Sequence, residues 1–327
     1  MKKKRIIWID VLRLVGILMV LIIHVVGNTI NTFGLSGDAA LVYKVLSGIS
    51  AASISLFVLI SGGMFLGKDI SYKDMFFKYI IKILVGIVIV GFIYSMMELV
   101  FINGTFKLTF IIDCFNKIIK MDTWAHMWYL YLVLVLYLLT PILRLFVKKL
   151  NRVEYAIILC ILGIATIIIP EIGIIKFALL GYIFCYLYGY YIYNYDVHII
   201  YKILSYIGLL VGVGYAIYLV VNTGELEVIK YTSLTAILIS NGLFLLAKNI
   251  KFKENKLTSY ITSIGICSYG IYLIHQLFIN IIYKLLKLDI IVKYPVLIIV
   301  YILVIFALSY ICVYFARKSK FLSKYLI

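Results

Sequence analysis

Residues 6–26 read IIWIDVLRLVGILMVLIIHVV, an apolar run interrupted only by Asp10, Arg13 and His24. A helix that crosses a bilayer needs roughly 20 mostly apolar residues, and this run has that length. The basic residues before it resemble the start of a signal peptide. Asp10 and Arg13 break the apolar part, however, and no clear A-x-A-like cleavage site follows. We therefore interpret residues 6–26 as a retained first transmembrane helix.

Comparable apolar runs recur along the whole chain, which is 65% apolar and 14% charged, with a mean hydropathy of +1.12. Backbone polar groups in lipid must be satisfied internally, and the runs lack the strict alternation of a barrel strand. We predict an all-α, polytopic transmembrane bundle of about ten helices, forming one integral membrane domain over 1–327 with no separate soluble domain. The predicted spans are 6–26, 46–66, 79–101, 125–147, 154–170, 174–194, 199–221, 231–248, 261–283 and 294–316.

The fifth and sixth spans are separated only by Pro170, Glu171 and Gly173, so a single re-entrant unit is an alternative there. Two small-residue ridges predict close helix packing. Gly208 and Gly212 form one, and Gly181, Cys185 and Gly189 form the other. Small residues at this spacing let helix backbones approach closely in lipid.

The net charge is +17, but the basic residues are spread over short loops and form no single basic face. We therefore expect no nucleic-acid partner and expect the lipid bilayer instead. Predicted inner segments carry about twice as many Lys and Arg as outer ones, which places both termini in the cytoplasm of a multi-pass cell-membrane protein. The five cysteines and four histidines show no metal-ligand spacing, so we predict no metal and no bound cofactor.

Ionisable groups within a span are costly and are therefore functional candidates. Asp10 and Arg13 are three residues apart and can pair on one helix face. His24 lies eleven residues after Arg13, about three turns and roughly 16 Å along the axis, so both side chains share that face. They cannot touch each other, but they can contact the two ends of one long ligand. The alternative from these residues alone is an interfacial ion pair and an interfacial histidine.

Four motifs in order resemble the acyltransferase-3 family. Arg13, ten residues and His24 match its R-x10-H signature, and residues 56–62 (LFVLISG) are similar to its F-x-x-SG stretch. Residues 126–130 (HMWYL) and 268–275 (SYGIYLIH) resemble two later segments. The resemblance implies about ten membrane helices, a cytoplasmic acyl-CoA donor and transfer of acyl groups to surface glycans and related acceptors. One departure lies after the second span, where lysines including Lys78 and Lys82 stand in place of an R-x-x-R pair, which puts bidentate phosphate binding there in doubt.

With this resemblance, we expect His24 to be the general base that takes a proton from an acceptor hydroxyl. An imidazole has an unperturbed pKa of about 6.5, which suits that role. Arg13, next to Asp10 and with Lys78 and Lys82, is expected to hold the CoA phosphates. Glu98, at a similar predicted depth to His24, is a candidate to orient the imidazole, and an interfacial carboxylate facing water is the alternative.

Further residues are expected on the acceptor side or in support of the site. His126, with Trp128 and Tyr129, is a candidate to bind the sugar or the developing oxyanion, and an aromatic-belt role is the alternative. Ser61 and His275 lie in family-like segments and are expected to support the site. For Ser61 we weigh a nucleophile only as the lesser option, since serines in membrane helices commonly bond back to the helix.

The sequence thus predicts a membrane O-acyltransferase, with acetyl as the expected group, in which acetyl-CoA or another acyl-CoA is the co-substrate. The acceptor is a hydroxyl of a cell-surface or lipid-linked glycan. The alternative function is a transporter or exporter of a polysaccharide or lipid-linked glycan, although no inverted repeat is evident. A channel or scaffold would leave the spacing of Arg13 and His24 without a role.

Overall fold

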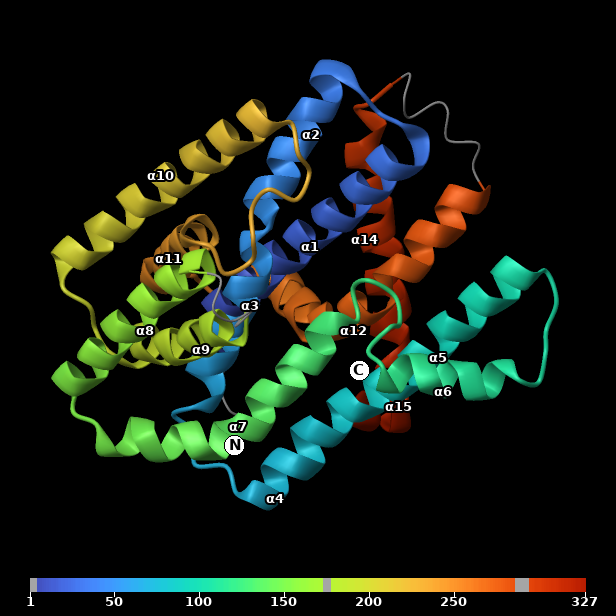
Figure 1. Ribbon diagram of the computed structural model, residues 1–327. Helices are drawn as coiled ribbons and strands as arrows, with labels where there is room; N and C mark the ends of the chain where they lie inside the picture. Colours follow the sequence, from blue (N-terminus) through green and yellow to red (C-terminus); the bar gives the residue numbers. More distant parts are fainter. Residues whose placement is uncertain (1–4, 173–177, 286–293) are drawn as a thin grey trace. The chain divides into compact units, whose positions relative to one another are not determined.

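The computed structural model describes residues 5–172, 178–285 and 294–327 (Figure 1). Within them the chain is helical and contains no β-strand. Seven segments in this described part are long and apolar enough to cross a membrane, which confirms the predicted all-α polytopic bundle. Each of the ten predicted spans overlaps a helix within the described residues. The seven segments are Ile7–Thr32, Gly37–Phe65, Tyr72–Asn103, Trp128–Lys149, Ile199–Thr223, Lys256–Tyr283 and Leu297–Ala316.

Some sequence predictions fall on residues outside the described part. They concern Gly173, which was expected to separate the fifth and sixth spans, and several lysines used to predict the topology. Those lysines are Lys2, Lys3, Lys4, Lys176, Lys287 and Lys293. The two spans themselves are separate helices, α8 (Arg152–Ile172) and α9 (Ala178–Asn194).

The helices group into two compact units. The first comprises residues up to Gly67 together with Phe146–Ile311, and the second comprises Lys68–Leu145 together with Cys312–Ile327. Besides α8 and α9, the first unit contains the helices α1 (Ile7–Phe33), α2 (Gly37–Ser50), α3 (Ala52–Phe65), α10 (Ile199–Thr223), α11 (Leu234–Asn249), α12 (Lys256–Leu285) and most of α14 (Leu297–Ala316).

Glycines set the closest helix approaches in the first unit. A Cβ on Gly189 of α9 would lie 2.1 Å from the carbonyl oxygen of Leu59 in α3, and one on Gly62 of α3 would lie 1.8 Å from that of Tyr186. No larger residue fits at either position. On α10, a Cβ on Gly212 would lie 3.2 Å from the carbonyl oxygen of Thr235 in α11. Both predicted small-residue ridges are therefore packing seams, as expected for helices in lipid.

Helices α1 and α12 run side by side in the same direction. Near their N-terminal ends, Gly265 of α12 lies against Asp10 of α1. Toward their C-terminal ends, the Tyr283 hydroxyl donates to the carbonyl oxygen of Val25 at 3.0 Å and also bonds the Thr29 hydroxyl. These contacts at both ends fix the two helices as a parallel pair, and α14 packs on the C-terminal part of that pair.

The second unit contains α4 (Tyr72–Met75), the π-helix η1 (Phe76–Ile80), α5 (Ile81–Asn103), α6 (Phe110–Ile119), the part of α7 (Trp128–Lys149) before Phe146, and α15 (Lys320–Tyr325). The Lys82 ammonium donates to the carbonyl oxygen of Ser323 at 3.4 Å and so joins α5 to α15. Arg144 of α7 is buried and donates to the carbonyl oxygen of Ile70 at 2.8 Å. Neither α6 nor α15 was predicted from hydropathy.

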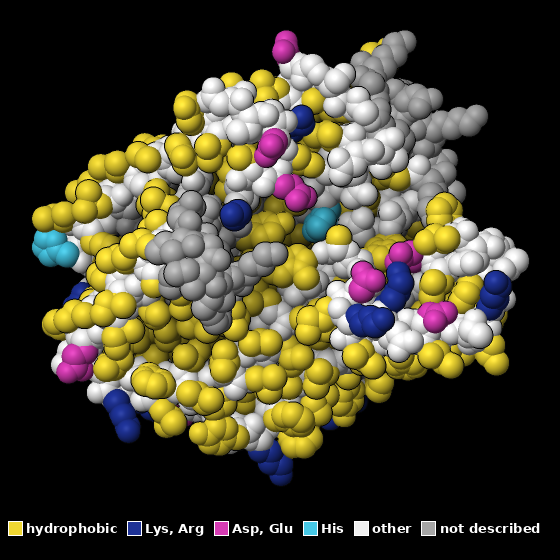
Figure 2. All heavy atoms as spheres, in the orientation of Figure 1, with side chains coloured by type: hydrophobic (Ala, Val, Ile, Leu, Met, Phe, Trp, Pro, Cys, Tyr) yellow, Lys and Arg dark blue, Asp and Glu magenta, His cyan; other side chains and the backbone are white. Residues whose placement is uncertain are grey.

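Hydrophobic side chains cover most of the visible molecular face (Figure 2). Long rows on α10 and α14 are exposed, including Leu210, Val211, Leu303 and Val304. Soluble monomers rarely expose apolar patches of this extent, whereas lipid tails are a suitable solvent for them. The surface therefore agrees with the composition in identifying a membrane protein.

Candidate active site

Asp10 forms the centre of a charged cluster near the N-terminal end of α1. The Arg13 guanidinium donates to Asp10 Oδ1 at 3.0 Å, which confirms the predicted pair. Arg5, which precedes the helix, contacts Asp10 Oδ2 through Nε at 3.4 Å. The Asp10 side chain is only 2% exposed, whereas that of Arg13 is 25% exposed. The carboxylate is therefore fixed inside the protein, and it presents a guanidinium that a ligand can reach.

The backbone of α12 closes the other side of the Asp10 carboxylate. A Cβ on Gly265 would lie 2.6 Å from Asp10 Oδ1 and 2.7 Å from Asp10 Cβ. Only glycine allows this approach. Asp10 is thus held between α12 and two guanidinium groups, which leaves its carboxylate little freedom to move.

Two histidines meet at the other end of the same helix pair. The ring centroids of His24 on α1 and His275 on α12 are 5.1 Å apart, with the rings tilted by 43°. His24 is partly exposed and His275 is fully buried. His24 is therefore the more exposed of the two histidines.

Hydrogen bonds define the tautomer of neutral His275. Its Nδ1 lies 2.7 Å from the carbonyl oxygen of Tyr272 and 3.3 Å from that of Ile271. Carbonyl oxygens only accept, so Nδ1 must carry the proton and donate it. In the neutral ring Nε2 is then an acceptor.

The charged cluster and the histidine pair are separated by about three helical turns, or roughly 16 Å, along α1. On α12, Gly265 lies beside Asp10 of the charged cluster and His275 lies beside His24. Phe57 of α3 packs its ring against Gly16 of α1, where a Cβ would lie 2.9 Å from the ring. The LFVLISG stretch therefore supports α1 about one turn after Arg13, and Ser61 in the same stretch is partly buried.

Other predicted site residues belong to the second unit. Glu98 forms an ion pair with Lys117 of α6, with Nζ and Oε1 2.9 Å apart. Lys78 lies on the π-helix and pairs with Asp74 at 2.9 Å, where both side chains are largely exposed. π-Helical turns are rare and often occur at functional sites. Lys82, on the following turn, bonds to α15 as described above.

His126 lies in an aromatic cluster of the second unit. Tyr94 stacks on Trp124 with centroids 4.2 Å apart, and the His126 ring lies edge-on to Tyr94 at 5.2 Å. His126 is only 2% exposed. Trp128 and Tyr129 follow at the start of α7, partly buried and edge-to-face at 6.2 Å. His126 is therefore buried among aromatic rings, and its predicted role toward the acceptor stays a prediction.

A family model described as an acyltransferase domain, that of the acyltransferase-3 family, matches residues 6–314, which is nearly the whole chain. The chain belongs to the acyltransferase-3 family. The predicted resemblance is thus confirmed, and together with the apolar helices it identifies a membrane acyltransferase. No curated protein and no solved structure matches the chain.

In this acyltransferase, sequence reasoning missed Arg5 and Gly265. Arg5 precedes the helix, so helical spacing gave no signal for its contact with Asp10. Gly265 precedes the family-like segment 268–275, and only the tertiary contact shows what its missing Cβ allows. Among the described residues, no group of three or more His, Cys, Asp and Glu side chains is arranged to hold a metal ion.

Proposed function

We propose that this acyltransferase moves an acyl group, acetyl in the first instance, from acyl-CoA to a hydroxyl of a cell-surface or lipid-linked glycan. One observation carries the proposal. The α1–α12 pair presents a reachable guanidinium, Arg13, at one end and a partly exposed imidazole, His24, about 16 Å away at the other. A long donor with anionic phosphates at one end and a thioester at the other suits that spacing.

The donor lies along this pair in the proposed arrangement. Arg13 binds the CoA phosphates, because a guanidinium supplies paired donors to phosphate oxygens. Asp10 fixes the direction in which Arg13 points. Lys78 and Lys82 add positive charge for the phosphates, and the pantetheine arm extends toward His24. With both termini in the cytoplasm, the phosphates lie at the cytoplasmic face of the cell membrane and the acceptor lies toward the outer face.

His24 acts as the general base. It accepts the proton of the acceptor hydroxyl as the oxygen attacks the thioester carbonyl carbon. The new C–O bond forms, the C–S bond breaks, and the protonated imidazole returns its proton to the leaving sulfur. The products are the O-acylated acceptor and CoA, and the base is regenerated.

Two residues are candidates to orient the His24 ring. The contact between the rings and the Nδ1–H tautomer of His275 support His275, whose Nε2 is an acceptor. Glu98 is the candidate that the sequence predicted, and its carboxylate has a partner in Lys117. The structural observations favour His275 for this role. The assignment of Glu98 stays a prediction.

On the acceptor side, we assign the partly exposed Trp128 and Tyr129 to binding the glycan, since aromatic faces and polar tips suit a sugar ring. The buried His126 is assigned to supporting them. Ser61 lies on α3, which packs on α1 through Phe57 and Gly16, and we assign it to supporting α1 there. These residues touch the acceptor or hold the site in place, and none is given a covalent step.

The test follows the acyl group itself. Permeabilised membranes that contain the chain receive acetyl-CoA labelled in the acetyl group, and label released from glycan by mild alkali is counted as O-ester. Wild type and His198→Ala, which removes an exposed histidine at the start of α10, should transfer label equally. At equal protein level, His24→Ala should transfer label to glycan at a rate reduced by roughly 100-fold or more. If wild type transfers neither acetyl nor a longer acyl group, the proposal is wrong.

A further inference from the structure

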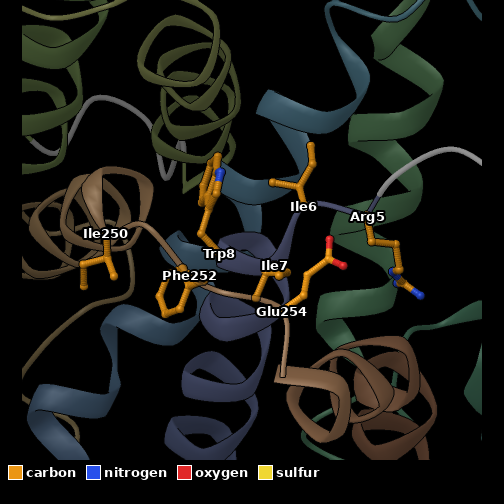
Figure 3. A pocket seen from close by; sticks show the side chains of 7 residues that line it. All are labelled: Arg5, Ile6, Ile7, Trp8, Ile250, Phe252 and Glu254. Atoms are coloured by element: carbon orange, nitrogen blue, oxygen red, sulfur yellow. The ribbon is translucent and has the colours of Figure 1, made fainter. Parts of the chain in front are cut away.

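A hollow of about 550 Å³ lies beside the N-terminal end of α1. It is lined by residues from two segments, Arg5–Trp8, which lead into the first turn of α1, and Ile250, Phe252 and Glu254 in the loop before α12 (Figure 3). Its volume is in the range of small-molecule sites, roughly 300–1,000 Å³. All of its lining residues belong to the first unit.

The hollow is directly connected to the charged cluster. Arg5 lines the hollow and also contacts Asp10 Oδ2 at 3.4 Å, while Arg13 binds the other oxygen of the same carboxylate. Arg5 and Arg13 thus contact the two oxygens of one carboxylate. A ligand that occupies the hollow and contacts Arg5 therefore lies close to Arg13 as well. The hollow extends the α1–α12 site at the end opposite the histidines.

The hollow has apolar side chains on one side and charged side chains on the other. In Figure 3, Ile250, Phe252 and Trp8 lie on one side and the charged ends of Arg5 and Glu254 on the other. Trp8 is held in place by edge-on contact with Phe244, whose ring centroid is 5.2 Å away. Aromatic rings with aliphatic neighbours suit a planar heterocyclic base, since every base has a face on which a ring can stack.

The charges around the hollow suit a phosphorylated ligand. The loop reads IKFKENK over residues 250–256, so Lys251, Lys253 and Lys256 alternate with the lining residues, and all three are exposed. Arg5, which also contacts Asp10, and these three lysines, which lie next to the lining residues in the sequence, are four cations against the two carboxylates of Glu254 and Asp10. The Glu254 carboxylate can accept a hydrogen bond from an exocyclic amine, a group that adenine has.

We propose that this hollow binds the 3′-phosphoadenosine end of acyl-CoA. The inference rests on the proposed function, because it names where the nucleotide end of that donor lies. The adenine stacks against Phe252 or Trp8, Arg5 and the loop lysines bind phosphate, and the diphosphate continues to Arg13. The pantetheine arm then follows the α1–α12 pair to His24.

An anionic lipid headgroup would also bring phosphate to this surface. A headgroup has no planar base, so its binding would depend on the lysines and not on the Phe252 ring. Binding of the nucleotide would depend on both. Substituting the ring alone therefore distinguishes the two sources.

The test uses the full chain purified in detergent. Binding of labelled CoA and its displacement by adenosine 3′,5′-bisphosphate are measured for wild type, Phe252→Ala and Lys253→Ala. Phe321→Ala removes an exposed ring of α15 and is the control. Both loop variants should bind CoA and the bisphosphate roughly tenfold more weakly than wild type and the control. In membranes, Phe252→Ala should raise the KM for acetyl-CoA by a similar factor and leave transfer from S-acetylpantetheine, which lacks the nucleotide, unchanged.

The outcomes separate this inference from the proposed function. If wild type transfers acetyl from acetyl-CoA but Phe252→Ala binds CoA and the bisphosphate as tightly as wild type, the hollow is not the nucleotide site and the proposed function stands. Loss on Lys253→Ala alone, with no change on Phe252→Ala, indicates a phosphate or lipid site and also overturns the inference. If wild type binds no CoA and transfers no acyl group, both proposals are wrong.

Discussion

The rings of His24 and His275 lie 5.1 Å apart between centroids, one on α1 and the other on α12. The hydrogen bonds of His275 to the carbonyl oxygens of Tyr272 and Ile271 fix its ring and its tautomer. His24 is the more accessible of the two. In the proposed mechanism, His24 transfers the proton and His275 positions its ring.

Substituting His275 should therefore affect the catalytic step more than donor binding. We expect His275→Ala to lower kcat roughly tenfold or more, because His24 loses the group that orients it. The KM for acetyl-CoA should stay within about twofold. His275→Gln, which restores a side chain with a hydrogen-bond acceptor, should recover part of the kcat. Equal losses in both variants together with a lowered melting temperature would show that His275 only fills space.

Glu98→Gln tests the alternative group for orienting His24. The Glu98 carboxylate already pairs with Lys117, and such partly exposed pairs contribute about 0–1 kcal/mol. We expect transfer within about twofold of wild type and a small loss of thermal stability. The initial rate of transfer at saturating acetyl-CoA is the measurement. A fall as large as that of His275→Ala would assign the orienting role to Glu98.

Asp10→Asn keeps the shape of the side chain and removes its charge. Arg13 and Arg5 then lose their shared carboxylate, so the Arg13 guanidinium is no longer held in one direction. We expect the KM for acetyl-CoA to rise roughly tenfold with a smaller change in kcat, because hydrogen bonds to charged groups contribute about 1.5–3 kcal/mol. An unchanged KM in correctly folded protein would mean that Asp10 does not position Arg13 for the donor.

Gly265→Ala tests the close approach of α12 to Asp10. The added Cβ would lie 2.6 Å from Asp10 Oδ1, so α12 must shift away from α1. Overpacking of this kind costs about 1–3 kcal/mol, and we expect a lower melting temperature together with weaker donor binding. Gly214→Ala is the matched control, because a Cβ there meets nothing within 4 Å. If both variants behave like wild type, the helix pair tolerates a wider spacing than the structure indicates.

Most of the helices could be predicted from hydropathy because the cost of burying polar backbone in lipid dominates their placement. The start of the second span was wrong: the helical segment begins at Gly37, whereas the prediction began at residue 46 because Asp38 and Lys44 lower the local hydropathy. Helices α6 and α15 were missed for a related reason, since both are too short to span a bilayer. Their positions depend on tertiary contacts, such as that between Lys117 of α6 and Glu98.

Part of the site could also be predicted, because helical spacing alone puts Asp10, Arg13 and His24 on one face. The partners on α12 could not be found in this way. Nothing in the sequence places His275 beside His24 or Gly265 beside Asp10, since those contacts depend on how two distant helices pack. The hollow beside Arg5 combines two such segments, and local pattern gave no sign of it.

The central claim is that one helix holds the donor at Arg13 and the base at His24. The most direct measurement is kcat and KM for acetyl-CoA of Arg13→Ala and His24→Ala in the same membranes at equal protein level. We expect His24→Ala to lower kcat roughly 100-fold or more with little change in KM. We expect Arg13→Ala to raise the KM roughly tenfold or more with a smaller change in kcat. Normal transfer by His24→Ala would contradict its role as the base. If kcat alone or KM alone changed in both variants, Arg13 and His24 would not have the separate roles proposed for the two ends of the site.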